Sequence, residues 1–472
     1  MKINRRNKIT GIFLVLALTI ITIVVFRIQK LFYPDIFLIT VDALRPDHLT
    51  CYGYQRKTSP NMDNLSQQGT LFLNCYSTCP ITLQSTVGLL TGRYLGNDKY
   101  IPNWENILDK EFTTLAEYLK KFGYYSAALL DNISYEEGRG FEQGFDDFFV
   151  TPPTDAKDLT ERALIFLQNR RHRNRPLFIW VHYMDTHPPY NFREEYMKMF
   201  EGDRLYNNND KILKLKPEGL LQSEFRKKWS SGGYIPWVAF RKDRFSLNYY
   251  IAGYDSAICY TDLYIGELLR HIKNNAIIIL TADHGESLGE HNVYFNHGEN
   301  IYNEQLHIPL IIKDKRCFKE GRVISMAISI IDIVPTILSR INPLWFFFNR
   351  KHFDGIDLKL ILKNDTSPRK YIYSYVLYPH PSPSFWSILD VKRNIKYIFC
   401  SEMNKEELFI LPDETSNLIN ETHSDIPVFK KELSENLKQW KKIYPVRSDK
   451  NSRRVSIDEH RIDILRSLGY VQ

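Results

Sequence analysis

Three short runs of consecutive apolar residues stand out along the chain, at residues 36–41, 177–181 and 276–280. Each run is rich in β-branched side chains and does not alternate with polar residues, as expected for strands that are buried on both faces. Such strands are typical of a parallel or mixed sheet covered by helices.

Helical periodicity separates these runs. Residues 114–122 place Leu115, Leu119 and Phe122 at helical spacing, and Gly123 follows as a helix terminator. Residues 255–271 repeat apolar side chains at the same spacing. The alternation of buried strands with amphipathic helices predicts an α/β layered sandwich.

The pattern weakens in two places. Residues 191–248 are polar with few clear periods, which predicts an excursion over the rim of the sheet. After a predicted helix at 331–338, residues 342–349 are aromatic and irregular, so we expect a domain boundary there. We therefore divide the chain into an N-terminal segment at 1–30, a main domain at 31–345 and a small C-terminal subdomain at 346–472. The subdomain should contain antiparallel strands at 371–376, 394–399 and 407–411 and a closing helix at 428–443.

Residues 10–26 form an uncharged, largely apolar run. A helix of that length spans roughly 25 Å, near the lower limit for crossing the hydrocarbon core of a bilayer. A cleaved signal peptide is the alternative, but the residues after the run offer no pair of small side chains for cleavage. Four basic residues precede the run and two follow it, which places the N-terminus in the cytoplasm. We expect a single-pass signal anchor in the cell membrane and an extracytoplasmic body.

Composition narrows the class of protein. Of the 472 residues, 43 % are hydrophobic and 25 % charged, which excludes a disordered or collagen-like chain. The formal charge is +7, but residues 1–34 contain six basic residues and no acid, so the folded body is nearly neutral. We expect no nucleic-acid partner, because nucleic-acid binding concentrates positive charge on the folded domain.

Polar side chains follow each of the three predicted strands. Since the carboxyl ends of strands form the ligand crevice of open α/β sheets, these side chains should converge although they are distant in sequence. Two carboxylates and an imidazole at one edge are costly without a cation between them, and this set suits Mn²⁺, Zn²⁺ or Mg²⁺. The residues concerned are Asp42, His182, Asp185, His187, Asp283, His284 and Glu286.

A candidate nucleophile lies further along the chain, in residues 80–93. Thr82 begins a helical stretch that runs to Thr91. Its hydroxyl would stand at a helix N-terminus, where free N–H groups and the dipole favour an anion such as phosphate or sulfate. Metal coordination would lower the pKa of this hydroxyl and make it nucleophilic near neutral pH.

These residues also have purely structural interpretations. Thr82 alone is a common helix N-cap, and Asp42 alone is a common strand-end aspartate. His182 could be a hydrogen-bonded core histidine. His187 and His297 lie in loops next to Pro and Gly, where function is favoured over a place in the core.

A series of segments, in the right order, resembles the sulfatase branch of the alkaline phosphatase superfamily. The segment that begins at Asp42 resembles the first metal-ligand segment of the family, and 182–190 resembles its His-x-x-Asp-x-His-x-Pro-Tyr segment. The resemblance covers nearly all of the chain beyond residue 30 and implies an alkaline-phosphatase-like three-layer sandwich with a large mixed sheet and a small antiparallel α+β subdomain. The similar segments are 42–53, 58–63, 89–93, 182–190, 281–286, 296–298, 407–409, 413–418 and 468–471.

Two departures from the family pattern bear on the chemistry. Sulfatases carry a Cys or Ser that becomes formylglycine where this chain has Thr82. Threonine lacks the second hydroxyl that expels sulfate, but it is the nucleophile in relatives that hydrolyse or transfer phosphodiesters and phospho-headgroups. The second aspartate of the family is replaced by Ala43, which favours an ion smaller than Ca²⁺, with Ca²⁺ as the alternative.

Together with the predicted anchor, the resemblance implies a membrane-anchored, metal-dependent hydrolase or phosphotransferase whose Thr82 attacks a phosphoester. His187 and His297 would hold the non-bridging oxygens, and one of them would protonate the leaving group. A sulfuric ester hydrolase and a non-catalytic membrane-tethered binding domain are the alternatives. The substrate could be a lipid headgroup, an anionic glycan or a small ester. The implied metal ligands are Asp42, Thr82, Asp283 and His284.

Overall fold

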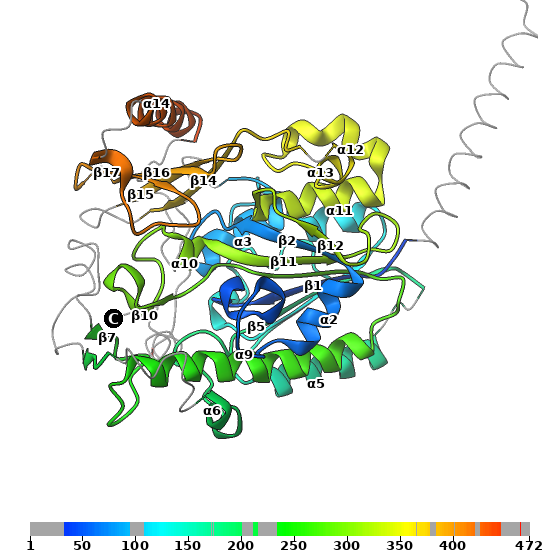
Figure 1. Cartoon of the computed structure of the whole chain (residues 1–472). Helices are drawn as coiled ribbons and strands as arrows, with labels where there is room; N and C mark the ends of the chain where they lie inside the picture. The colour runs from blue at the N-terminus through cyan, green and yellow to red at the C-terminus, as the bar shows by residue number, and fades with distance from the viewer. Residues whose placement is uncertain are drawn as a thin grey trace, which may run out of the picture.

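The computed structural model of the chain is built around one large mixed β-sheet with helices on both faces (Figure 1). The strand order is β12-β2-β11-β8-β1-β5-β3-β4, and β13 also pairs with β2. The structure describes residues 33–94, 108–170, 172, 174–200, 211–215, 234–364, 366–377, 384–400, 402–420, 425–444 and 463. The strands of the large sheet are β1 (Ile36–Val41), β2 (Thr70–Tyr76), β3 (Tyr125–Leu130), β4 (Asp147–Val150), β5 (Leu177–Tyr183), β8 (Ile277–Ala282), β11 (His307–Lys313), β12 (Arg322–Ile324) and β13 (Ile328–Ser329).

The three predicted strands form the centre of this sheet. β1 lies between β5 and β8 and pairs in parallel with both. Every residue of β1, β5 and β8 is buried, which explains why each strand reads as a continuous apolar run rather than an alternating one. β11 is antiparallel to its neighbours β8 and β2, so the sheet is mixed, as predicted.

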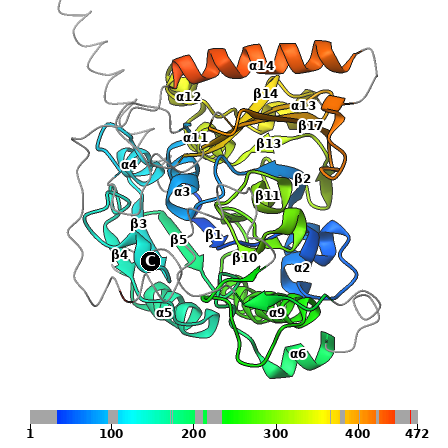
Figure 2. The same ribbon diagram turned by 90° about the vertical axis from the view of Figure 1, so that its left-hand side faces the viewer.

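Two groups of helices cover the sheet (Figure 2). On one face lie α2 (Pro60–Gln68), α5 (Ala156–Asn169) and α9 (Leu247–Arg270), and on the other lie α3 (Thr82–Thr91), α4 (Leu115–Lys121) and α11 (Ile333–Ile341). α4 matches the predicted helix, and Thr114 begins it with a capping box to Glu117. α9 begins eight residues before the predicted start at 255, because Ser246 caps it through the backbone N–H of Tyr249.

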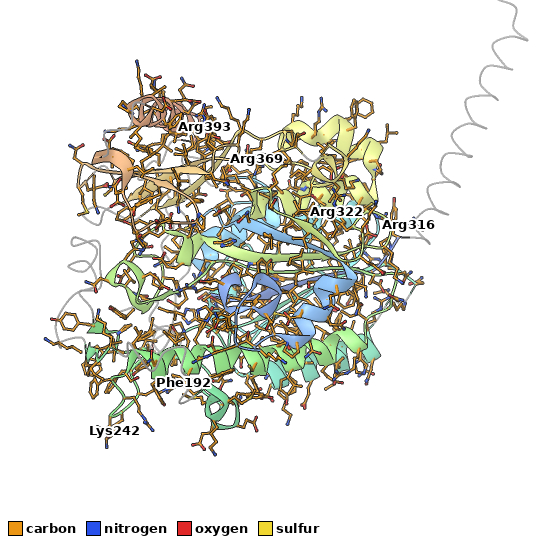
Figure 3. All side chains as sticks on the ribbon, in the orientation of Figure 1. Phe192, Lys242, Arg316, Arg322, Arg369 and Arg393 are labelled. Carbon is orange, nitrogen blue, oxygen red and sulfur yellow. The ribbon has the colours of Figure 1, made fainter. Side chains whose placement is uncertain are left out.

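The C-terminal part adds a four-stranded antiparallel sheet with a helix packed on it (Figure 1). Its strands are β14 (Tyr371–Val376), β15 (Phe385–Asp390), β16 (Ile395–Cys400) and β17 (Lys405–Ile410), and its helix is α14 (Ile426–Ile443). The sequence predicted three of these strands and missed β15, whose six residues are all buried and show no alternation. Arg369, which Figure 3 labels, joins this part to the main domain. Its guanidinium donates two hydrogen bonds to the Asp332 carboxylate, at 3.1 and 2.6 Å.

Residues 342–349, whose sequence shows no helical period, include the helix α12 (Pro343–Asn349). The side chain of Asn342 caps the backbone N–H of Trp345, and Pro343 occupies the first helical position. Trp345 packs edge-on against Tyr118 and Phe122, which fixes α12 beside α4.

The predicted excursion at 191–248 is described only in part, and it includes α6 (Glu194–Phe200) packed on α9. The predicted anchor at 10–26 lies outside the described residues, and no helix within the described part of the chain is long and apolar enough to cross a membrane. The remaining short elements are β6 (Lys214–Leu215), β7 (Tyr234–Ile235), β9 (Ser287–Leu288), β10 (Tyr294–Asn296), α10 (Asn303–Leu306), α13 (Lys359–Asn364) and the 3₁₀ turns at Pro46–His48, Thr50–Tyr52, Ile133–Tyr135, Glu290–Asn292, Ile330–Asp332, Arg350–His352 and Leu418–Asn420.

Candidate active site

The two strand-end aspartates are placed together by the register of the sheet. Val41 of β1 pairs with Ala282 of β8, so the residues that follow, Asp42 and Asp283, leave the sheet side by side. The backbone N–H of Ala43 donates to Asp283 Oδ1 at 3.2 Å, which ties the two strand ends. Ala43 has φ 55°, a left-handed conformation that is strained for a residue with a Cβ. Both aspartates are fully buried.

His182 supports Asp42 through a chain of hydrogen bonds. The indole N–H of Trp180 donates to Thr40 Oγ1 at 2.9 Å, and Thr40 Oγ1 lies 2.8 Å from His182 Nδ1. Thr40 Oγ1 accepts from Trp180, and its own hydrogen can point at the Val181 carbonyl oxygen at 3.5 Å or at Nδ1 at 2.8 Å. The shorter contact favours Nδ1 as the acceptor, which leaves the ring proton on Nε2. His182 Nε2 then donates to Asp42 Oδ2 at 3.3 Å.

His284 has the opposite arrangement. Its Nδ1 lies 2.8 Å from the carbonyl oxygen of Gly285, which can only accept, so Nδ1 carries the proton. The lone pair on Nε2 faces the interior of the site, 3.7 Å from Asp42 Oδ1 and 3.5 Å from Asp283 Oδ2. His284 can therefore ligate a cation, whereas His182 holds a carboxylate in place.

Thr82 lies at the start of α3, facing this cluster. Ile81 is the N-cap residue, so Thr82 is the first helical residue and does not act as the cap. Its Oγ1 lies 3.0 Å from His284 Nε2. Ser85, one turn later, donates to the carbonyl oxygen of Asp283 at 2.6 Å and fixes the helix on the end of β8. The N-terminal N–H groups and dipole of α3 thus point at the same place as the threonine hydroxyl.

His297 and His187 complete one side of the site. The ring of His297 lies 4.3 Å from that of His284 and 4.9 Å from that of His187, centroid to centroid. His187 Nδ1 donates to the Pro188 carbonyl oxygen at 2.6 Å, which orients the ring. His297 Nδ1 lies 3.3 Å from Glu286 Oε2. The structure thus brings together all six residues expected to carry the chemistry.

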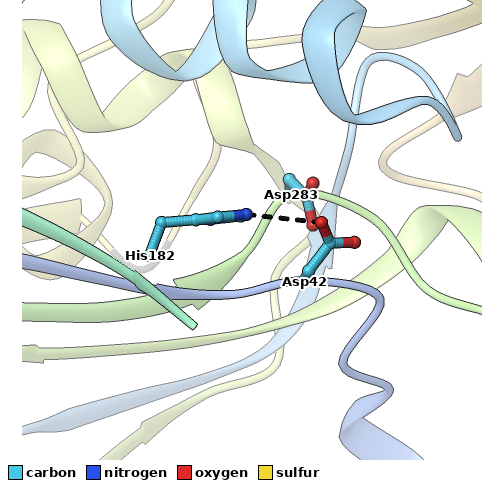
Figure 4. Close-up of side chains that lie close together, drawn as sticks. All are labelled: Asp42, His182 and Asp283. Atoms are coloured by element: carbon cyan, nitrogen blue, oxygen red, sulfur yellow. Dashed lines mark hydrogen bonds and ion pairs between the residues drawn. The ribbon is translucent and has the colours of Figure 1, made fainter. Parts of the chain in front are cut away.

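The buried oxygens of this cluster fit a cation. One carboxylate oxygen each of Asp42 and Asp283 and a ring nitrogen of the supporting His182 lie within 4.8 Å of one another (Figure 4). Asp42 Oδ1 and Asp283 Oδ2 are buried and have no hydrogen-bond partner among the described residues. Two such oxygens with the lone pair of His284 form a hard, anionic donor set, which suits a divalent ion.

The pKa shifts point the same way. Burial raises the pKa of the Asp42 carboxyl, but the surrounding imidazoles, His187 foremost, outweigh burial and hold the net pKa below the usual range. Burial and then the negative charge of Asp42 raise the pKa of Asp283. Two ionised carboxylates this close repel each other unless a cation lies between them. Burial lowers the pKa of His187 and of His297 to about 4, so both rings are neutral at neutral pH.

Some residues differ from the sequence-based expectation. Asp185 lies outside the cation cluster, because its carboxylate accepts from the backbone N–H of Ala156 at 3.3 Å and from Asn191 at 2.6 Å. Asn132 was not predicted, although its amide donates to Asp42 Oδ2 at 3.2 Å. It follows the buried strand β3, so the rule that located Asp42 and Asp283 could have located it.

Comparison with known proteins identifies the family of the chain. The Sulfatase family model matches residues 34–342. The chain is 24 % identical to the N-acetylglucosamine-6-O-sulfatase of Bacteroides thetaiotaomicron over 495 residues, 87 % of this chain and 87 % of that protein. It is 23 % identical to the iduronate 2-sulfatase of Homo sapiens over 338 residues, 59 % of each, and so spans less than two thirds of that relative. Its fold is similar to the phosphonate monoester hydrolase of Agrobacterium radiobacter, with a TM-score of 0.66, 18 % identity, and coverage of 87 % of this chain and 96 % of that one. The chain belongs to the sulfatase family of the alkaline phosphatase superfamily.

Proposed function

We propose that the protein is a divalent-cation-dependent ester hydrolase that uses Thr82 as the nucleophile on a phosphoester. One observation supports this proposal above the others: the Thr82 hydroxyl begins α3 and lies 3.0 Å from His284 Nε2, beside the two buried carboxylates. A helix N-terminus favours the phosphoryl group, and the hydroxyl stands where an anion bound there would be attacked.

Asp42, Asp283 and His284 would hold the cation, with the Thr82 hydroxyl as a further ligand. When bound, a divalent ion lowers the pKa of a coordinated hydroxyl and neutralises charge on a phosphoryl oxygen. Thr82 Oγ1 would form the new bond to phosphorus while the ester bond from phosphorus to the leaving oxygen breaks, aided by the N–H groups at the start of α3. Water or another acceptor would then release the phosphoryl group from Thr82.

His187 and His297 would bind the remaining phosphoryl oxygens. Both rings are neutral in the free protein, since burial lowers each pKa to about 4. The negative charge of a bound phosphoester raises the pKa of a neighbouring imidazole. Substrate binding would therefore favour the protonated form that donates a proton to the leaving oxygen.

A phosphoester is favoured over a sulfate ester because of the nucleophile. Thr82 is neither the Cys nor the Ser from which sulfatases form formylglycine, so the aldehyde hydrate that expels sulfate is not accessible to it. A sulfuric ester hydrolase is the second candidate, favoured by the relatives named as sulfatases. We also propose, from the sequence of residues 1–30, that the enzyme is anchored in the cell membrane with the site outside the cytoplasm.

The test compares Thr82→Ala with Thr91→Ala, which removes another buried hydroxyl of α3. That hydroxyl donates to the Val87 carbonyl oxygen at 2.6 Å and accepts from the backbone N–H of Arg93 at 3.3 Å, at the end of the helix away from the site. Both variants and the wild type are assayed with an aryl phosphodiester and an aryl sulfate, with added Mn²⁺, Zn²⁺ or Mg²⁺. We expect Thr82→Ala to lose phosphodiester turnover by more than about a thousandfold and Thr91→Ala to retain it.

Intact mass after brief incubation with each substrate identifies the intermediate. A phosphoryl adduct present in the wild type and absent in Thr82→Ala supports the proposal. An adduct formed only with the aryl sulfate replaces it with the sulfatase alternative. Unchanged turnover in Thr82→Ala excludes Thr82 as the nucleophile.

A further inference from the structure

Helix α12 exposes an apolar face that no described part of the protein covers. Leu344, Phe347 and Phe348 lie at helical spacing i, i+3 and i+4 and are 70 %, 58 % and 68 % exposed. We call these three side chains the α12 ridge. The opposite face of the helix, Trp345 and Phe346, is packed against the core. Large side chains gathered on one exposed face of a short helix indicate a contact surface.

The margin of the ridge is basic. The guanidinium of Arg350 lies 5.2 Å from the ring centre of Phe347, and Lys351 is exposed next to it. On the α4 side, the amino group of Lys121 lies 5.1 Å from the ring centre of Tyr118, which packs on Trp345. No acidic residue occurs from 340 to 353. Aromatic and aliphatic side chains beside Arg and Lys are what the interface of an anionic bilayer binds.

The ridge also lies beside the point where the predicted anchor joins the folded body. The Tyr33 ring stacks on Tyr124 at 5.9 Å, and the Tyr124 hydroxyl donates to the Pro34 carbonyl oxygen at 2.9 Å. Tyr124 closely follows Phe122, whose ring packs on Trp345 of α12 at 5.4 Å. Only residues 27–32 separate the apolar run at 10–26 from Tyr33, roughly 25 Å even at full extension. A bilayer that holds the run is therefore within reach of α12.

We propose that the α12 ridge docks on the surface of the membrane, with its rings at the level of the headgroups and Arg350, Lys351 and Lys121 against anionic lipid. The proposal rests on the predicted anchor and not on the chemistry at Thr82. The alternative is that the α12 ridge binds a second copy of the chain. Three side chains of this size expose on the order of 400 Å², about half of what each partner buries in a standard protein interface, which favours lipid.

The test uses the full chain reconstituted in vesicles of phosphatidylcholine with phosphatidylglycerol. A photoreactive benzoylphenylalanine replaces Phe348 in one protein and, as a matched control, Phe149 in another. Phe149 is 49 % exposed on β4, opposite Leu129 near the carboxyl end of β3 and so away from α12. After illumination, mass spectrometry measures lipid adducts and gel electrophoresis measures chain-to-chain adducts.

We expect lipid adducts at position 348 and none at position 149. Arg350→Gln and Lys351→Gln should each lower the docked-to-undocked ratio about fivefold on vesicles with phosphatidylglycerol. On phosphatidylcholine alone neither change should have an effect. If the protein does not float with the vesicles, the predicted anchor does not hold it in the membrane, and the proposal is overturned. Equal lipid adducts at 348 and 149, or chain-to-chain adducts at 348, overturn it directly. None of these outcomes depends on turnover at Thr82.

Discussion

Substituting His182 by asparagine and by glutamine separates a positioning role from a ligand role. The side-chain amide of asparagine reaches about as far as Nδ1 of histidine, so it can still contact Thr40 but is too short to donate a hydrogen bond to Asp42. A glutamine amide reaches about as far as Nε2, so its N–H₂ group replaces the donor that lies 3.3 Å from Asp42 Oδ2. We expect His182→Asn to weaken cation binding and His182→Gln to restore most of it.

The magnitude follows from the partners of Asp42 Oδ2. This oxygen accepts from Asn132 at 3.2 Å and from His182 at 3.3 Å, and both distances are long for bonds to a carboxylate. A hydrogen bond to a charged group contributes about 1.5–3 kcal/mol, and the long distance argues for the lower end. A loss of about 1.5 kcal/mol corresponds to roughly tenfold weaker binding of the ion.

The assay is calorimetric titration of the full chain with Mn²⁺, accompanied by turnover at rising Mn²⁺ concentration. For His182→Asn we expect roughly tenfold weaker affinity and recovery of most of the turnover once the ion is saturating, because the ligands themselves remain. The same affinity loss in the Gln and Asn variants would mean that His182 supplies a lone pair to the ion. An unchanged affinity in His182→Asn would refute the hydrogen-bond chain through Thr40.

Two further predictions concern stability. Arg369→Met leaves the buried Asp332 carboxylate without its bidentate partner, so we expect a loss of about 3–5 kcal/mol in the free energy of unfolding, measured with denaturant; a loss below about 1 kcal/mol would contradict this. Burial opposes protonation of His291, but the hydrogen bond to Glu304 at 3.0 Å, the charge of Glu304 and the contacts with Glu414 together outweigh burial and raise the pKa above 6.5. The protonated ring is therefore favoured in the folded state, and its contribution is complete below pH 6.5 and lost as the pH rises through the folded pKa. The unfolding free energy of His291→Gln should therefore differ most from that of the wild type below pH 6.5, and the two should converge above the folded pKa of His291. A difference that does not change with pH would refute the raised pKa of His291.

The sequence was most informative for the central strands of the large sheet. β1, β5 and β8 are buried on both faces, so an unbroken apolar run marked each one. The convergence of Asp42 with Asp283 and His284 followed from the rule that strand ends share one edge. α12 was missed because a stretch of four consecutive aromatic residues has no period, and only the packing of Trp345 shows which side faces the core.

The role of His182 lay beyond the reach of the sequence. Whether its Nε2 donates or accepts depends on the hydrogen of Thr40, which depends in turn on the indole of Trp180. These contacts cross between adjacent strands and exist only once the register is set. The separation of Asp185 from the cluster likewise depends on where Ala156 and Asn191 lie in space.

Strand β1 runs from the edge of the sheet where the chain enters to the edge where the proposed active site lies, so its length sets the distance between the two. Pro34 precedes the first residue of β1 and Asp42 follows the last, and a strand of six residues at about 3.3 Å per residue separates the two by roughly 20 Å or more. An anchor at the entry end would hold the nucleophile above the bilayer by about that height, facing away from it. Such a stand-off suits an ester that arrives from the aqueous side, on a glycan or a small molecule, better than one whose phosphate lies at the level of the headgroups. With such an anchor, the strand that leads to Asp42 would also act as a spacer, and its length would favour substrates by their distance from the membrane.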